Sequence, residues 1–177
     1  MTEIASPASE VAAPDLAAAA DVIALASGVV ATGVKTLATT GGPDVQQVLA
    51  YDIAHAAAQV ETARALLPYG AKGDVEARIT CAFTADMAHD LISRLVGRES
   101  YWGVGDRPLQ AAHAFLEKFR APEFVASLAD TPGPRHLAAD MEMVADTFRS
   151  FGEKVIKTHA EHVHRNNDDV PEEIVQG

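Results

Sequence analysis

The chain has 177 residues, 48% of them apolar, and a formal net charge of −11 from 25 acidic and 14 basic residues. This length suits one domain with a single core, and the acidic balance argues against binding nucleic acid or an anionic membrane, which need clustered Lys and Arg. Cys81 is the single cysteine, so no internal disulfide forms. We expect a cytoplasmic protein, because the N-terminus lacks the basic start of a secretory signal and no stretch reaches the ~18–20 apolar residues of a membrane span.

Residues 1–13 are small and polar, which predicts a disordered leader. Pro14 and Asp15 then begin an alanine-rich helix that ends at residues 39–42, Thr-Thr-Gly-Gly. Its larger apolar side chains spread around most of the circumference, so we expect burial on more than one side. These residues are Leu16, Val22, Ile23, Leu25, Val29, Val30, Val34 and Leu37.

A second helix is predicted from Pro43 to about Leu67, because proline suits a first helical position and apolar residues then recur at spacings of three and four. Its stripe is Val45, Val48, Leu49, Ile53, Ala56, Val60, Ala63 and Leu67. A third helix is expected from Asp74 to near Gly97, with Phe83 in the core. Its apolar face is Val75, Ile79, Ala82, Phe83, Met87, Leu91 and Leu95.

Residues 99–105 are interpreted as a glycine-punctuated loop. Pro108 begins a fourth helix, and Pro122 interrupts it because an interior proline loses one hydrogen bond. The core residues expected of this segment are Leu109, Ala112, Leu116, Phe119, Phe124, Val125 and Leu128. A fifth helix follows over 135–164, with Leu137, Met141, Val144, Phe148, Phe151, Val155, Ile156 and Val163.

The fold class predicted is all-α, an up-and-down bundle of about five helices. We divide the chain into a leader (1–13), an accessory helical bundle (14–130), and a segment (131–177) holding the last bundle helix. Residues 170–177 have the pattern of a helix start, with proline early and two glutamates in the first turn. They form either a frayed tail or the beginning of a longer, truncated domain. A partner region covering the fifth helix would leave Phe148, Phe151 and Ile156 partly exposed here.

Three histidines lie close together at His159, His162 and His164, but a structural zinc site needs four convergent ligands. We therefore expect a solvated helix end, where protonated histidine suits the helix dipole. His55 with Glu61, and Asp86 with His89, fall short of a di-iron bundle, which needs Glu-x-x-His on two helices.

Cys81 is flanked by apolar residues and is expected to be a buried, inert thiol. The glycines of 97–105 follow a helix instead of a strand, which argues against a phosphate-binding loop. Tyr101 and Trp102 in that segment are either a core plug or a contact surface.

Two stretches together resemble the extra N-terminal helical region of long acyl-CoA dehydrogenases, a family that includes methylsuccinyl-CoA dehydrogenases. The first comprises residues 51–55 (Tyr-Asp-Ile-Ala-His), 71–78 (Ala-Lys-Gly-Asp-Val-Glu-Ala-Arg) and 97–104 (Gly-Arg-Glu-Ser-Tyr-Trp-Gly-Val). The second comprises 159–165 and 169–174, which are similar to the opening helices of the catalytic core. The resemblance covers about residues 45–177 and favours a truncated C-terminal domain.

The resemblance implies an oxidoreductase in which a glutamate removes the α-proton of methylsuccinyl-CoA, the β-hydride passes to FAD to give mesaconyl-CoA, and electrons leave to an electron-transferring flavoprotein. None of the catalytic or flavin-contacting positions has a match in this chain, so no catalytic, cofactor-binding or metal residue is assigned. The segment is expected to bind no FAD itself and to have a structural or assembly role, partnered by the rest of the dehydrogenase chain or its subunits in a homo-oligomer. The alternative is a free-standing helical scaffold or interaction protein without enzymatic activity; a histidine-based metal protein is a third hypothesis.

Overall fold

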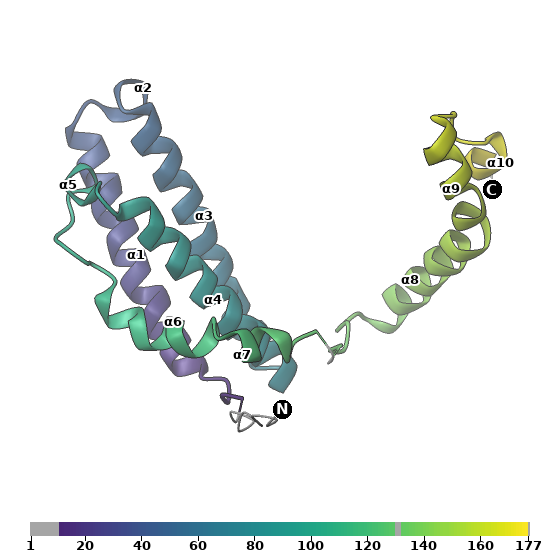
Figure 1. The fold of residues 1–177 in the computed structure, drawn as a ribbon, viewed down its shortest axis with the longest axis horizontal. Coiled ribbons are helices and arrows are strands. Elements are labelled where there is room, and N and C mark those ends of the chain that lie inside the picture. The colour runs from purple at the N-terminus through teal and green to yellow at the C-terminus, as the bar shows by residue number, and fades with distance from the viewer. Residues whose placement is uncertain (1–10, 130–131, 177) are drawn as a thin grey trace, which may run out of the picture. The chain divides into compact units, whose positions relative to one another are not determined.

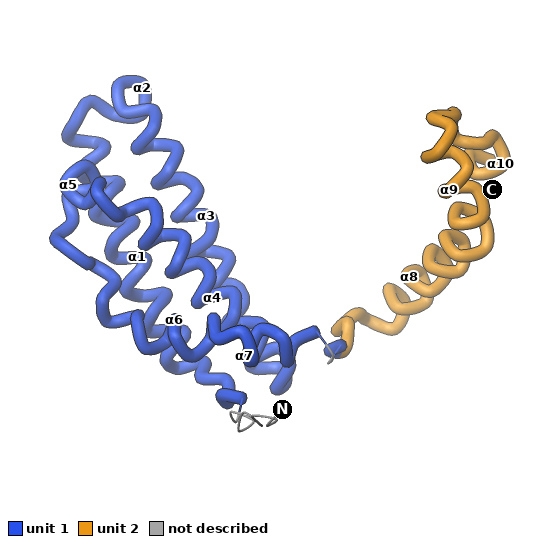
Figure 2. The backbone as a smooth tube through the Cα atoms, in the orientation of Figure 1, with its two compact units in different colours: residues 1–133 blue, residues 134–177 orange. Residues whose placement is uncertain are grey.

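The computed structural model describes residues 11–129 and 132–176, and every regular element in these ranges is helical, as predicted. The chain divides into two compact units, residues 1–133 and 134–177, coloured separately in Figure 2. The first unit contains α1 (Leu16–Thr39), α2 (Gly42–Val45), α3 (Gln47–Gly70), α4 (Asp74–Leu95), α5 (Glu99–Trp102), η1 (Gln110–Ala112), α6 (His113–Phe119) and α7 (Pro122–Ala126). The second contains α8 (Ala139–Phe151), the π-helical turn η2 (Gly152–Ile156), α9 (Lys157–Asn166) and α10 (Glu172–Gln176).

Three long helices, α1, α3 and α4, lie side by side and form the body of the first unit (Figure 1). Short connections join them, so successive helices run in opposite directions, as in an up-and-down bundle. The shorter α6 packs against α4 and α1 and closes one side. The helix expected over 135–164 belongs to the second unit, so the bundle of the first unit is built on three long helices.

The core has two parts that meet on α1 and α4. One part lies between α1, α3 and α4 and includes Ile23, Ile53 and Leu91. The other lies between α1, α4, α6 and α7. There the ring of Phe119 meets Phe115 at a tilt, with centroids 4.5 Å apart, and Phe124 edge to face, with centroids 5.0 Å apart. Because α1 packs on several helices, the prediction that it is buried on more than one side is confirmed.

The predicted faces of the two following helices need correction. On α3, Leu49, Ile53, Ala56, Val60 and Ala63 are buried as expected. Val45 and Val48 are exposed instead, since the helix breaks at Gln46 and begins again at Gln47.

On α4, Val75, Ile79, Ala82 and Phe83 are half-buried, and the buried positions include Thr80, Cys81, Thr84, Ala85 and Ala88. The physical reason is that α4 packs on both sides. Its small residues let α6 and α1 approach closely. The prediction considered only one stripe of large side chains and therefore missed these small buried residues.

The segment 99–105 contains the short helix α5, which corrects the expectation of a loop throughout. Trp102 is completely buried and Tyr101 is exposed, so the tryptophan plugs the core. It lies so close to α1 that a Cβ added at Gly33 would come within 2.7 Å of Trp102 Cε3. Gly103 ends α5 with φ +70°, a backbone conformation that glycine adopts without steric cost.

Pro122 does interrupt the fourth predicted helix and begins α7. That helix is also shorter than expected, because residues 110–112 form a 3-10 turn before α6. Leu109, Ala112, Leu116, Phe119 and Phe124 are buried as predicted, whereas Val125 is exposed.

The second unit has no buried core among its described residues, all of which are half-buried or exposed. The fifth predicted helix begins at Ala139 and not at 135, and η2 interrupts it before α9. Asn167 ends α9 in the left-handed conformation with φ +53°, and the amide of Asp168 donates to the Val163 carbonyl at 3.1 Å. The turn and the short α10 follow, as predicted.

One element departs from the membrane expectation. The 24-residue α1 is long and apolar enough to cross a membrane by length and composition alone. In the structure its apolar residues, such as Val22 and Ile23, form core contacts with neighbouring helices. This arrangement is compatible with the core helix of a soluble protein. The predicted leader lies largely outside the described residues.

Candidate functional site

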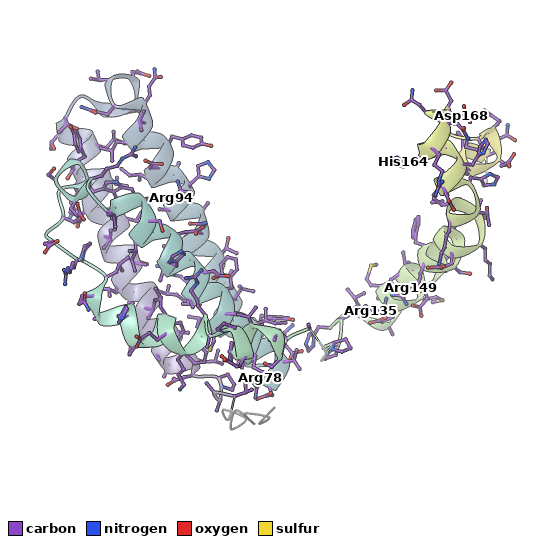
Figure 3. The ribbon with its side chains drawn as sticks, in the orientation of Figure 1. Arg78, Arg94, Arg135, Arg149, His164 and Asp168 are labelled. Carbon is purple, nitrogen blue, oxygen red and sulfur yellow. The ribbon has the colours of Figure 1, made fainter. Side chains whose placement is uncertain are left out.

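The three clustered histidines do not converge. His159 is half-buried and its Nε2 lies 3.2 Å from Glu173 Oε1, which joins α9 to α10. His162 Nε2 lies 3.2 Å from Asp168 Oδ2, and His164 is exposed near the end of α9 (Figure 3). In the described part of the chain, no three His, Cys, Asp or Glu side chains are placed to hold a metal ion.

The other polar candidates have ordinary local partners. The ring of His55 packs on Tyr51 with centroids 4.3 Å apart, and Glu61 pairs with Arg64 at 3.1 Å. Asp86 pairs with Arg120 at 2.9 Å, which joins α4 to the end of α6. These contacts account for the residues as surface polar groups that link neighbouring turns or helices.

Cys81 is fully buried, as predicted. Burial raises the pKa of its thiol above the usual value, and the backbone amide of Asp15 opposes this slightly by donating to Sγ at 3.3 Å. A thiolate is the reactive form of cysteine, so the structure gives Cys81 the role of a small core residue of α4 that lies beside the start of α1.

The glycines near α5 are the candidate cradle for the pyrophosphate of FAD, which the resemblance implies. Such a cradle needs free backbone amides at a helix start, approached closely by the ligand. The open side of Gly103 is filled by Thr36, whose Oγ1 would lie 2.1 Å from an added Cβ. Gly103 is therefore closed to a phosphate group, whereas Gly97 and Gly105 have open space on the side where a Cβ would lie.

A cluster that the sequence did not reveal joins α3 to the end of α4. Asp52 accepts from Arg94 at 3.1 Å and from Arg98 at 2.7 Å, and its side chain is only 13% exposed. Arg94 is labelled in Figure 3. The two arginines are four residues apart, a spacing that could have indicated a shared face, but their acidic partner is distant in the sequence.

A pocket of about 390 Å³ lies beside this cluster. It is lined by Gln46, Val48, Leu49, Asp52, Gly97, Arg98, Tyr101 and Trp102. Because both oxygens of Asp52 are already bound by the arginines, the cluster is best explained as a tie between α3 and the turn after α4. The two charged residues of its lining, Asp52 and Arg98, are paired with each other at 2.7 Å.

The most distinctive surface of the second unit is a row of apolar residues along α8, which we call the α8 stripe: Met141, Val144, Phe148 and Phe151. Met141 is 50% exposed, Val144 45% and Phe148 71%, and Phe151 is half-buried. Phe148, Phe151 and Ile156 are thus all partly exposed, as we expected of a helix that a partner region would cover. Side chains of this size are seldom exposed together unless another surface covers them.

Charged pairs lie on the opposite side of α8. Arg135 pairs with Glu142, and Arg135 and Arg149 both lie 3.1 Å from Asp146. Figure 3 labels both arginines near α8. Residues 142, 146 and 149 are spaced by four and three within α8, which places them together on one helix face. The helix thus has one apolar side and one charged side.

Comparisons of the chain with protein-family models, with curated proteins and with solved structures found no match.

Proposed function

We propose that this chain is an assembly domain, in which the bundle of the first unit is the folded body and the α8 stripe of the second unit is the contact surface. The observation that carries the proposal is that Met141, Val144 and Phe148 are exposed and Phe151 is half-buried on a unit in which no described residue is buried. An amphipathic helix of this kind gains most of its stability from packing its apolar face against another surface.

We further propose that the domain belongs to an FAD-dependent acyl-CoA dehydrogenase of the methylsuccinyl-CoA type, located in the cytoplasm. The resemblance of residues 51–55, 71–78 and 97–104, and of 159–165 with 169–174, supports this assignment. Within that enzyme the domain assists packing and subunit assembly, while flavin chemistry and electron transfer to a flavoprotein partner belong to other parts of the chain or to other subunits.

The test is the product of the complete reading frame that contains this chain. We expect a yellow protein with flavin absorbance that bleaches when methylsuccinyl-CoA is added. Deleting residues 1–130 should lower its melting temperature or its assembly state while the bleaching rate per bound flavin changes little. The matched control is residues 1–177 alone, which should bind no FAD on titration.

A colourless product, or one that no acyl-CoA bleaches, would contradict the dehydrogenase assignment. The assembly function would then stand alone, as a free-standing helical interaction protein. Measuring the mass of the 1–177 chain separates these two parts of the proposal, because self-association needs no flavin.

A further inference from the structure

The pocket between the start of α3, the turn after α4 and α5 contains a buried hydrogen-bond donor without an acceptor. Trp102 lines this pocket and is completely buried, and in the described part of the chain its Nε1 has no hydrogen-bond partner. A buried N–H that lacks a partner has lost its hydration without compensation, which is unfavourable and rare in folded proteins. Such a group indicates that a water molecule or a ligand supplies the acceptor.

The packing of the indole ring on α1 leaves its N–H on the other side. The Cε3 atom of Trp102 lies within 2.7 Å of the place where a Cβ at Gly33 would be. In an indole, Nε1 is on the long edge opposite Cε3, so the N–H lies away from this contact. The helix that packs on α5 therefore does not supply the missing acceptor.

A second donor of the pocket is the guanidinium of Arg98. Its Nη1 donates to Asp52 Oδ2 at 2.7 Å, while its Nε and Nη2 meet no acceptor among the described residues. Arg94 donates to the other oxygen of Asp52 at 3.1 Å, so two positive charges share one carboxylate. The surplus positive charge favours an anionic group in the pocket. The net charge of −11 opposes this weakly, because salt screens distant acidic groups over about 8 Å.

The rest of the lining is mainly apolar or aromatic. Leu49 is buried, whereas Val48 and Tyr101 are both 67% exposed and lie toward the solvent. The volume of about 390 Å³ falls within the range of about 300–1,000 Å³ that is typical of small-molecule sites. Apolar walls that carry two free donors favour a ligand with one anionic end and one apolar end.

We propose that this pocket binds a small carboxylate with an apolar body, whose carboxylate accepts hydrogen bonds from Arg98 and from Nε1 of Trp102. The apolar body packs on Leu49 and Tyr101. Asp52 keeps its two arginine partners, because Arg98 has further N–H groups to donate to the ligand. The site belongs to the first unit alone and is independent of the assembly function above.

The indole N–H reports on the site directly, because Trp102 is the single tryptophan of the chain. Phenylacetate or hexanoate, added to the 177-residue chain from about 0.05 to about 20 mM, should shift its nitrogen–proton NMR signal saturably, with a dissociation constant on the order of 0.1–1 mM. Phenylacetamide and hexanamide match these acids in shape but are neutral, and they should bind at least about tenfold more weakly. Shifts at Val144 and Phe148 with a stationary indole signal would show adsorption to the α8 stripe and would overturn the proposal.

Two matched pairs of variants test the charge. Arg98→Gln should weaken phenylacetate binding about tenfold, whereas Arg64→Gln should leave it unchanged, although the two arginine side chains are 52% and 51% exposed. Val48→Glu places a negative charge at the pocket and should also weaken binding about tenfold. Val45→Glu should not, because Val45 is 70% exposed but does not line the pocket.

The Val48 variant keeps the test decisive if Arg98→Gln does not fold. Equal affinity for acid and amide, or equal effects of the two valine variants, would overturn the carboxylate assignment. An indole signal that none of the four compounds shifts would overturn the site, and a water molecule would then be the partner of the Trp102 N–H.

Discussion

Trp102 and Phe83 differ in burial although both are large aromatic residues of the first unit. Trp102 is fully buried against Gly33 and Ile53, whereas Phe83 is only half-buried at the edge of the same core. We expect Trp102→Ala to lower the free energy of unfolding by about 3–5 kcal/mol and Phe83→Ala by about 1–2 kcal/mol. Urea unfolding followed by far-ultraviolet circular dichroism measures both, and equal losses would contradict the placement of Phe83.

The thiol of Cys81 should be protected in the folded protein. Burial raises its pKa above the usual value of 9.0, so the folded state keeps the proton while an unfolded chain loses it above that pH. The free energy of unfolding should therefore fall as pH rises past 9.0. Alkylation by iodoacetamide at neutral pH should be at least about 100-fold slower than in urea, and rapid labelling of the native chain would show that Cys81 is accessible.

The burial of individual residues was predictable from the sequence where their neighbours along the chain are mostly apolar. The burial of Cys81, Leu116 and Phe119 follows directly from their local sequence. The burial of Thr80 and Thr84 was missed because a threonine is expected to be exposed from its residue type alone. In the structure the Thr80 hydroxyl donates to the carbonyls of Leu66 and Glu76, which allows it to be buried between two helices. The burial of Thr84, whose hydroxyl has no hydrogen-bond partner in the described part of the chain, is equally invisible in the spacing of apolar residues.

At the scale of elements, Asp52 ties α3 to the end of α4. Asp52→Asn leaves Arg94 and Arg98 without their shared carboxylate, and since the Asp52 side chain is 13% exposed we expect a loss of about 1–3 kcal/mol. The matched control is Glu61→Gln, whose pair with Arg64 joins side chains that are 64% and 51% exposed. That change should cost less than about 0.5 kcal/mol. Thermal unfolding of both variants compares them, and similar losses would show that the Asp52 cluster is an ordinary surface pair.

The boundaries of the helices were predicted better than the faces that they bury. Pro43, Pro122 and Gly73 punctuate the chain in the expected places because their backbone constraints act locally. The face of α4 and the division at Gln46 depend on which helices pack beside them, which is a property of the tertiary structure. The Asp52 cluster was missed for the same reason, since its members are brought together by the packing of α3 on α4.

At the scale of the whole molecule, the sequence indicated an all-helical chain with a boundary after residue 130, but it assigned the helix over 135–164 to the bundle, whereas that helix lies in the second unit. The stop at residues 131–134 was evident, yet the apolar residues of 137–163 looked like those of any core helix. In the structure the α8 stripe belongs to a unit in which no described residue is buried. The spacing of Met141, Val144, Phe148 and Phe151 was in the sequence throughout, and it becomes informative only together with that exposure.

Limited proteolysis tests the division between units. The described residues 132–138 are exposed and lie outside regular secondary structure, and they include Arg135, a trypsin site. We expect brief trypsin treatment to cut at Arg135 before the arginines of the bundle, such as Arg94, because a protease needs several residues of unfolded backbone to bind. The N-terminal product should keep the cooperative unfolding of the intact bundle, measured by circular dichroism. Arg135→Gln is the matched control and should slow this first cut. Early cutting inside α1, α3 or α4, or loss of cooperative unfolding after the cut at Arg135, would show that the first unit does not fold independently of the second.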